Sequence, residues 1–365
     1  MIKSKVDTPF LLVFLTLILF GLIIFTSAAL GLLGRGGATF TSVAVSQLLL
    51  GFVCGGIALL FFSRIDYRRL RPLTPYFFAF AMGLTLLTLV PHVGLELKGA
   101  ARWIQLGPVT FQPEEVLKFA AVLLLAAVYA AKLKSIRTLK DGLLPLLLIG
   151  GGSAAVLLMQ PTTDGAILIM AACTAMLFAA GGKVSHIALL AVAGMLVVGV
   201  AAYERPYLAE RFVTYFSDNA DPRGAGWQTE QSLIAVGSGQ LTGRGFGQSI
   251  EKFSYLPEPI GDSIFAVAAE EFGFVGSVLL VLMYAGVALL GLRIAARVPD
   301  AFGGLLVVGL VMIIIAQSFT NIASTLGLLP VSGLPLIFVS HGGTALALSL
   351  AEVGVILSVS RRMKP

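Results

Sequence analysis

Charged side chains are scarce in this sequence. Only 12% of the 365 residues are Asp, Glu, Lys or Arg, whereas charged residues make up about a quarter of soluble domains. The hydrophobic fraction is 57%, so the chain has too few charges to cover a water-facing surface. This composition excludes an ordinary soluble globular domain and indicates a polytopic membrane protein.

Cysteine is also nearly absent. The two cysteines, Cys54 and Cys173, lie inside apolar runs, where packing explains them best. They exclude a disulfide framework, and no spacing of His, Cys, Asp or Glu matches a metal site, so no metal ligand is predicted. The alternating segments of about ten residues that are typical of membrane β-barrels are missing as well.

Long apolar runs are what the sequence has instead. A membrane-spanning helix needs about 20 apolar residues, and about ten such runs follow one another. The runs are Phe10–Gly34, Gly36–Ser63, Pro72–Gly94, Phe119–Ala131 with Gln112–Lys118 as its polar start, Gly142–Met159, Gly165–Gly182, Val184–Tyr203, Ser263–Leu292, Ala301–Leu329 and Leu334–Ser360. The predicted fold is an all-α polytopic membrane protein, with residues 1–365 as one integral membrane domain. Because the apolar part of a cleaved signal has about 7–15 residues, we expect the longer first helix to be retained.

Basic residues favour one side of this predicted bundle. They are Lys3, Lys5, Arg64, Arg68, Arg69, Arg71, Lys132, Lys134, Arg137, Lys140, Lys183, Arg293, Arg297, Arg361, Arg362 and Lys364. In a ten-helix count they all fall on the side of the two termini, which the positive-inside rule makes cytoplasmic. The net charge of +6 is therefore mostly topological and is not evidence for nucleic-acid binding.

Two polar segments fall on the opposite side. One runs from about His92 to Gln112, and the other is a large extracytoplasmic loop of about residues 204–261. Connections usually have about 4–6 residues, and long ordered loops often carry function. Phosphate in this loop would have to be held by particular side chains. The candidates are Arg211, Arg223, Arg244 and Lys252, with Ser249 beside them.

The stretch LPEPIGDSIFAVAAEEFGFVG puts three carboxylates at the head of, and inside, an apolar run. Asp262 falls where the loop meets a helix. It either caps that helix or acts at the membrane–water boundary, and both interpretations stay open. Glu270 and Glu271 lie about 12 Å further along the helix, where charges are costly and rarely face lipid. A buried ion pair or hydrogen-bonded network is predicted for Glu271, and Glu270 is either structural or functional.

The stretch KGAARWIQLGPVTFQPEEVLKFA forms a second polar cluster. Pro113 suits the first turn of a helix, and the acids that follow suit its positive end. Glu115 and Lys118 are three residues apart, so they can pair on one helical face. Alternatively, Arg102 and Lys118 neutralise a lipid diphosphate.

Two further segments interrupt the apolar pattern. Met159–Met170 is a tight turn in which Asp164 is expected to cap the following helix. Gly327–Ala345 is rich in Pro and Gly, and irregular backbone at membrane depth is tolerated where it is buried or lines a cavity, so we expect a pocket there. His341 is more typical of a structural histidine than of a general base. Glu352 is expected to form a structural pair near the cytoplasmic end of the last helix.

Three long motifs carry a resemblance to a known family. KGAARWIQLG…FQPEEVLK, GAGWQTEQSLIAVGSGQLTGRGFGQSIEKFSYLPEPIGDSIFAVAAEEFGFVG and NIASTLGLLPVSGLPLIFVSHGG resemble the SEDS family (shape, elongation, division and sporulation), which includes RodA and FtsW. The likeness covers nearly the whole chain. It implies a ten-helix fold in the bacterial cytoplasmic membrane with cytoplasmic termini. It also implies a peptidoglycan glycosyltransferase that polymerises lipid II into β-1,4 glycan strands at the outer face, for cell elongation or division.

The resemblance also assigns residues. The essential aspartate of the family falls on Asp262, the Glu and Lys of its FQPSE..K motif fall on Glu115 and Lys118, and the Arg of KGA.RW falls on Arg102. The chain departs from the family in reading GDSIFA for TDFIFA, SHGGT for SYGGS and QPTTDG for QPDxGT, so Thr162 replaces the usual acid. The VSRR ending and GLLPVSGLPL favour the division branch.

A mechanism follows from this resemblance. Asp262 is expected to act as general base on the 4-hydroxyl of the acceptor sugar, with inversion at the donor. The leaving undecaprenyl diphosphate needs positive charge, from a divalent cation (Mg or Mn) or from basic side chains. These side chains are Arg102, Lys118, Arg211 and Arg244, with Glu115, Ser249, Lys252 and His341 as further substrate-binding candidates. The lipid tails are expected in a groove beside the eighth helix, floored near Pro335.

Partners are implied too. They are lipid II, a class B penicillin-binding protein with transpeptidase activity, and other divisome or elongasome membrane proteins. Two other functions remain open. A lipid II flippase or transporter would also suit buried acids and a discontinuous pocket, but it needs a polar path to both faces. A non-catalytic scaffold for the cross-linking partner leaves the placement of Asp262 unexplained.

Overall fold

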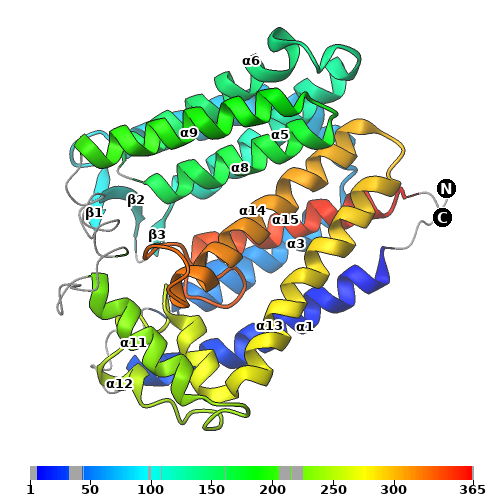
Figure 1. The fold of residues 1–365 in the computed structure, drawn as a ribbon. Helices are drawn as coiled ribbons and strands as arrows, with labels where there is room; N and C mark the ends of the chain where they lie inside the picture. The colour runs from blue at the N-terminus through cyan, green and yellow to red at the C-terminus, as the bar shows by residue number, and fades with distance from the viewer. Residues whose placement is uncertain are drawn as a thin grey trace.

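The computed structural model describes residues 6–32, 43, 45–97, 100–107, 109–160, 162–204, 215 and 225–363. Within these residues, eight helical segments are long and apolar enough to cross a membrane, and two shorter apolar helices accompany them. They confirm the predicted all-α bundle of about ten apolar helices, which Figure 1 shows as a ribbon.

The helices follow the apolar runs along the chain. The first half has α1 (Thr8–Leu30), η2 (Ser46–Cys54) continuing into α3 (Gly55–Arg64), η3 (Tyr67–Leu73) with α4 (Thr74–Leu87), α5 (Pro113–Lys132) with η4 (Leu133–Ser135), and a stack of η5 (Leu139–Leu143), α6 (Leu144–Leu146), η6 (Leu147–Gly151) and α7 (Gly152–Met159). The second half has α8 (Thr163–Ala179), α9 (Val184–Glu204), α13 (Ile264–Arg297), α14 (Ala301–Thr325) and α15 (Gly343–Ser360).

Helix α15 forms the centre of the core. It packs against α3 and α14, while α14 also contacts α5, α8 and α13. Small residues allow the closest approach: a Cβ added at Gly354 would lie 2.6 Å from the carbonyl oxygen of Leu59. Small residues at helix contacts are the usual means of tight packing in membranes, where the hydrophobic effect does not drive helices together.

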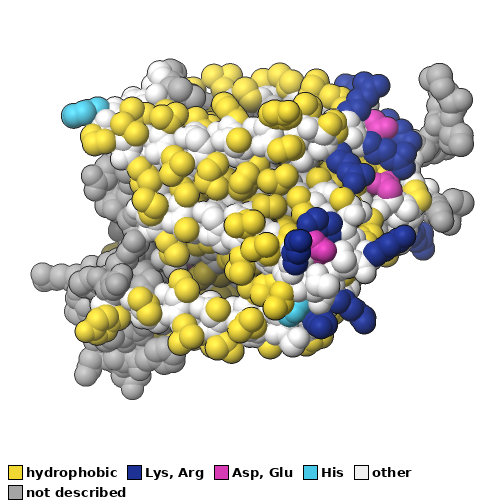
Figure 2. Space-filling model, turned by 90° about the horizontal axis from the view of Figure 1, so that it is seen from above, with side chains coloured by type: hydrophobic (Ala, Val, Ile, Leu, Met, Phe, Trp, Pro, Cys, Tyr) yellow, Lys and Arg dark blue, Asp and Glu magenta, His cyan; other side chains and the backbone are white. Residues whose placement is uncertain are grey.

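Both termini lie at one end of the bundle, which we call the terminal end (Figure 1). In the space-filling view, Lys and Arg side chains gather at this end, and apolar side chains cover the flank beside it (Figure 2). Three ion pairs connect chain segments there: Arg293–Asp7 at 2.7 Å, Arg362–Asp66 at 2.5 Å and Arg68–Asp300 at 3.0 Å. This gathering of basic side chains is the pattern that the sequence predicted for one side.

The opposite end, which we call the distal end, holds the two polar segments. The first forms a three-stranded antiparallel sheet of β1 (Gly94–Leu97), β2 (Ala100–Leu106) and β3 (Val109–Phe111). The second contains α11 (Ala225–Ser238) and α12 (Glu251–Ser254), so its described part is ordered as expected. The strands were not predicted, because pieces of three to seven residues carry too little alternation to show in the sequence.

Helix α13 is interrupted near its start. Gly273 has φ 65° and ψ −164°, and a Cβ at this residue would lie 2.3 Å from the Gly243 nitrogen. Only glycine adopts this conformation at little cost. The break leaves main-chain groups of α13 without helical partners. Residues 240–245 of the preceding loop form hydrogen bonds with them. Gln240 and Leu241 accept from Phe274 and Val275 (2.8 and 3.1 Å), and the amides of Arg244 and Gly245 donate to residues 270 and 271 (both 3.0 Å).

The chain between α14 and α15 is irregular over residues 326–342, as the Pro and Gly residues of this segment predicted. The last apolar run is therefore helical only from Gly343. Gln47 of η2 holds this segment: it donates to the carbonyl oxygen of Ser340 (3.2 Å) and accepts from the Gly342 amide (3.0 Å). The main chain of Ser340 and Gly342 is thus satisfied by a protein side chain, as irregular structure at membrane depth requires.

Candidate functional site

Asp262 lies at the distal end, in the turn that leads from α12 into α13, and its side chain is half-buried. The helix begins at Ile264 with Ser263 at the N-cap position, where no side-chain capping bond forms. Asp262 precedes that position, so it is not the N-cap residue. The carboxylate sits where the loop joins the bundle, as predicted.

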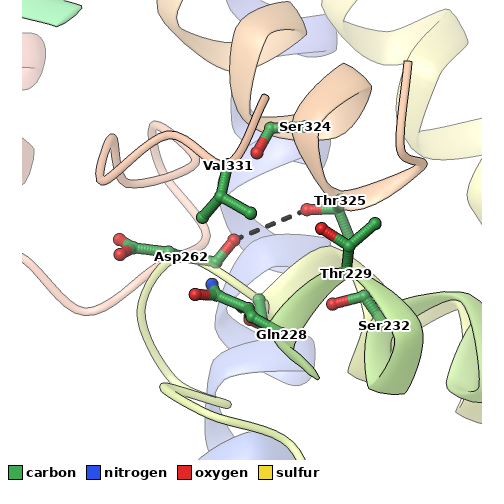
Figure 3. A pocket seen from close by; sticks show the side chains of 8 residues that line it. Gln228, Thr229, Ser232, Asp262, Ser324, Thr325 and Val331 are labelled. Atoms are coloured by element: carbon green, nitrogen blue, oxygen red, sulfur yellow. Dashed lines mark hydrogen bonds between the residues drawn. The ribbon is translucent and has the colours of Figure 1, made fainter. Parts of the chain in front are cut away.

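A small polar recess adjoins Asp262. It encloses about 180 Å³ including its open mouth, and it is lined by Gln228, Thr229, Ser232, Asp262, Ser263, Ser324, Thr325 and Val331. These residues come from α11, the turn before α13, the end of α14 and the irregular segment that follows α14. In Figure 3 the Asp262 carboxylate points away from the hydroxyl-bearing side chains, whereas its carbonyl oxygen faces Thr325. The recess therefore offers neutral hydrogen-bonding groups on one side of Asp262 and the carboxylate on the other.

Glu271 forms the predicted buried ion pair. Its Oε1 lies 2.6 Å from Nζ of Lys252, and neither side chain is more than 1% exposed. Lys252 also donates to Ser27 Oγ (3.0 Å), which in turn donates to Glu271 (2.7 Å). Because Ser27 belongs to α1, this pair ties the loop to both α1 and α13.

Glu270, directly before Glu271 in the chain, contacts the same loop. It accepts from Ser249 Oγ (2.6 Å) and from the amide of Ile250 (3.0 Å), and its Oε1 lies 3.4 Å from Nε of Arg244. Both glutamates therefore hold residues 244–252 against the broken start of α13. We call this set of contacts the loop latch. Ser249, Lys252 and Arg244 were predicted as substrate-binding residues; the structure places them in this latch, with Arg244 still 40% exposed.

The second predicted cluster forms the start of α5. Pro113 is in its first turn with Glu114 and Glu115, as expected. Nζ of Lys118 lies 2.8 Å from Glu115 and donates to Oε1 of Gln317 on α14 (2.8 Å). The predicted Glu115–Lys118 pair is confirmed, and the ammonium is fully enclosed. Arg102 on β2 is partly buried, and its positive charge attracts the carboxylate of Glu114.

Asp164 does not cap α8. Thr162 occupies the N-cap position, and Asp164 lies inside the first turn. Its Oδ2 instead accepts from the amide of Gly333 (3.2 Å), which joins the α7–α8 turn to the irregular segment. The capping prediction is therefore wrong, because the helix begins at Thr163. Thr162, which replaces the usual acid of the family, is buried and donates to the carbonyl oxygen of Gln160 (3.2 Å).

His341 and Glu352 are both enclosed. The His341 ring stacks on Phe25, and burial lowers the pKa of this histidine, opposed by the nearby carboxylate of Glu258. Its Nε2 is buried without a hydrogen-bond partner. Glu352 lies near the middle of α15 and its Oε2 is likewise without a partner. The predicted place of Glu352 near a helix end is therefore wrong, whereas its charge interacts with that of the buried Lys118.

Other candidates fall elsewhere. Arg211 and Arg223 lie outside the described residues. Among the residues that the structure describes, no group of three or more His, Cys, Asp or Glu side chains is placed to hold a metal ion. Sequence reasoning also missed Asn321 of α14, whose Nδ2 donates to the carbonyl oxygen of Asp262 (2.8 Å). Its signal was a polar side chain inside an apolar span, which is a functional hint by itself.

Comparisons with known proteins agree with this architecture. Residues 7–365 match a family model for FtsW, RodA and SpoVE, described as cell cycle protein. The chain is 36% identical to stage V sporulation protein E of Bacillus subtilis (strain 168) over 363 residues, which cover 99% of both chains. It is 33% identical to a protein of Geobacter sp. (strain M18) named "Probable peptidoglycan glycosyltransferase FtsW", over 87% of this chain and 85% of that one.

Two solved structures share the fold. One is a chain of a peptidoglycan synthase complex that coordinates polymerization and crosslinking, with a TM-score of 0.74, 27% identity and coverage of 94% of this chain and 96% of that one. The other is a mutant of the Thermus thermophilus rod shape determining protein RodA, with a TM-score of 0.72, 26% identity and 99% coverage of both chains. The similarity therefore spans the whole bundle and includes the distal end.

Proposed function

Because this chain belongs to the SEDS family of FtsW, RodA and SpoVE, we propose that it is a peptidoglycan glycosyltransferase that polymerises lipid II at the outer face of the cytoplasmic membrane. The observation that carries this proposal is the place of Asp262. It lies just before α13, at the distal end opposite the two termini (Figure 1), beside a polar recess. A lipid-borne sugar and water can meet a carboxylate there.

The orientation rests on charge. Lys and Arg side chains gather at the terminal end (Figure 2). Short loops that are rich in these residues stay on the cytoplasmic side of the membrane. With both termini cytoplasmic, the distal end with its sheet, α11 and Asp262 faces outward. Membership of the family supports the bacterial cytoplasmic membrane as the location, with the growing glycan outside it.

The chemical step is a substitution at the anomeric carbon of the donor. The Asp262 carboxylate takes the proton of the acceptor's 4-hydroxyl as that oxygen attacks. The bond from the anomeric carbon to the diphosphate breaks, and the undecaprenyl diphosphate leaves with the electron pair. Attack from the opposite face inverts the donor and gives a β-1,4 link. A positioned base contributes about 10²–10⁴-fold to such a step.

The leaving diphosphate needs positive charge at the distal end. Arg102 and Arg244 are the described basic side chains that suit this role, because Lys118 and Lys252 are enclosed in ion pairs. Within the described part of the chain the ligand set does not fit a protein-held metal ion, so no step is assigned to magnesium or manganese. The apolar recess of about 170 Å³ near Pro335 is too small for an undecaprenyl tail.

We further propose a transpeptidase partner of the class B penicillin-binding type. A chain of similar fold belongs to a peptidoglycan synthase complex that coordinates polymerization and crosslinking. Several large apolar side chains of α13, among them Phe274, Leu282 and Leu289, are exposed on the flank of the bundle. A partner's single membrane helix would bury such a face.

The decisive experiment supplies labelled lipid II to the protein purified with its partner. Asp262→Ala and Asp262→Asn should reduce glycan polymer by about 10²–10⁴-fold, the contribution of a general base. Glu230→Gln is the matched control, because it removes an exposed carboxylate from α11 at the same end. Equal polymer from all variants would overturn the assignment of Asp262.

The rival function is a lipid II flippase. Transport of lipid II across liposomes tests it directly. Transport by the wild type that persists in Asp262→Asn, with no polymer from either protein, would favour the flippase. A polymerase gives polymer from the wild type and no transport.

A further inference from the structure

Three consecutive main-chain carbonyls of the Asp262 turn are each held by a donor from elsewhere in the chain. The oxygen of Ile260 accepts from the His341 amide (2.7 Å), and that of Gly261 accepts from Ser340 Oγ (2.7 Å). The oxygen of Asp262 accepts from Nδ2 of Asn321 (2.8 Å). None of these three bonds uses the Asp262 carboxylate. They fix the backbone that carries it.

Asn321 makes a second bond with the same nitrogen. Its Nδ2 also donates to the carbonyl oxygen of Leu334 (2.8 Å), and the side chain is 1% exposed. The neighbouring Gly333 borders the carboxylate, since a Cβ built at Gly333 would lie 3.9 Å from Oδ2 of Asp262. One amide group therefore ties the backbone of Asp262 to the segment that flanks its carboxylate.

The helix that carries Asn321 is itself well supported. Gln317 lies one turn earlier on α14, donates to the carbonyl oxygen of Pro335 (3.2 Å) and accepts from Lys118 (2.8 Å). Lys118 is paired with Glu115. Through Gln317, the buried Glu115–Lys118 pair is thus connected to the irregular segment. Asn321, four residues later on the same face of α14, holds the Asp262 turn.

We propose that Asn321 is a positioning residue for Asp262. By holding the carbonyls of Asp262 and Leu334 at once, it sets the distance between the carboxylate and residues 333–334, and so the place where an acceptor hydroxyl must sit. This inference rests on the proposed function. A displacement of about 1 Å in a reacting group can cost about 10²-fold in rate. The loss of this single amide can therefore lower the rate of polymerisation strongly.

The alternative is a purely structural role, in which Asn321 only supplies hydrogen bonds to two buried carbonyls. Nearly all buried main-chain groups need such a partner. Both roles predict some loss of stability. They differ in the reaction, because a positioning residue acts through Asp262, whereas a stability residue changes only how much folded protein is present. The experiment must therefore separate kcat from the amount of folded enzyme.

The test uses Asn321→Leu, which keeps the approximate volume but cannot donate, and Ser340→Ala, which removes the donor to Gly261. Ser153→Ala is the control: Ser153 is buried on α7 and donates to the carbonyl oxygen of Ile149 one turn earlier (2.7 Å). Each variant is purified in complex with the partner, and its rate of lipid II polymerisation is measured per mole of folded protein. We expect kcat to fall about 10–100-fold in the first two, with KM changed less than about threefold, and no change in the control.

A double-mutant cycle adds the readout that a structural role would not move. In an Asp262→Glu background, where the carboxylate is already displaced, Asn321→Leu should cost less than about threefold, because coupled residues are not additive. Full multiplication of the two losses, or an unchanged kcat in folded Asn321→Leu, overturns the inference. If Asn321→Leu does not fold, Ser340→Ala decides by the same criteria. An active Asp262→Asn enzyme would instead overturn the assignment of Asp262 as the base, whereas a wild type that makes no polymer would refute the proposed function itself.

Discussion

The two ends of the bundle use charge in opposite ways. At the terminal end, ion pairs such as Arg362–Asp66 and Arg68–Asp300 lie at the surface, with both side chains more than a quarter exposed. At the distal end, Lys252–Glu271 and Lys118–Glu115 are enclosed, with side chains at most 6% exposed. Exposed pairs contribute about 0–1 kcal/mol, whereas breaking one partner of a buried pair costs several times more. The end assigned to chemistry is therefore the end whose architecture depends on paired buried charge.

The largest effect should come from unpairing a buried charge. Lys252→Met leaves Glu271 enclosed without its cation, so we expect a loss of about 3–5 kcal/mol in the free energy of unfolding. Unfolding by SDS in mixed micelles measures it. The double variant Lys252→Met/Glu271→Gln removes both charges and should regain most of the loss. A single variant as stable as the wild type would show that the loop latch does not hold the distal end.

A smaller effect is expected where α13 is broken. Gly273→Ala adds a Cβ 2.3 Å from the Gly243 nitrogen in a backbone conformation with φ 65°. The strain should cost more than about 1 kcal/mol, since such conformations suit glycine alone. Gly83→Ala is the control, because a Cβ in this α4 residue meets nothing within 4 Å. The same SDS titration should show the control equal to, or more stable than, the wild type.

At the terminal end, Asp300 gives a pH-dependent prediction. Burial alone would raise the pKa of this carboxyl, but hydrogen bonds from Tyr67, the Gly303 amide and Arg68 bring it below the ordinary aspartate value. A lowered pKa in the folded state adds stability above the unfolded pKa of about 3.9, and this is lost as the pH falls through the folded value. Asp300→Asn should therefore be less stable than the wild type at pH 7, by less than Lys252→Met. The difference should shrink toward pH 3, and a difference that grows on acidification would contradict the sign.

The smallest effect should come from Arg362. Its pair with Asp66 is exposed, so Arg362→Ala should change the free energy of unfolding by about 0–1 kcal/mol, and salt should screen what remains. Measurements at low and high ionic strength test this. A loss comparable to that of Lys252→Met would erase the contrast between the two ends.

The sequence predicted best what depends on local pattern. The ten apolar runs, Pro113 at the start of α5, the Glu115–Lys118 pair and the irregular segment before α15 all follow from spacing or from residue type. The place of Asp262 at the junction of loop and helix followed from the same pattern. Such features need only residues that are close along the chain.

What the sequence could not predict depends on distant segments meeting. Arg244, Ser249 and Lys252 were expected at substrate, but their partners Glu270 and Glu271 lie about 20 residues away on a helix whose break at Gly273 brings the loop alongside. Asn321 was overlooked because its two acceptors, Asp262 and Leu334, come from separate segments. Asp164 was taken for a cap because its hydrogen-bond partner, the Gly333 amide, lies on a segment far along the chain.

The interruption in α13 also bears on how the protein meets bilayers of different thickness. An unbroken helix of 34 residues would be about 51 Å long, far beyond a hydrocarbon core of about 30 Å. After Gly273, about 36 Å remain, a length that fits with slight tilt. The short piece before it belongs with the loop and the Asp262 turn. The part of α13 after Gly273 can then change its tilt to match longer or shorter acyl chains, while the Asp262 turn keeps its place. Glycan synthesis should therefore tolerate changes in membrane thickness.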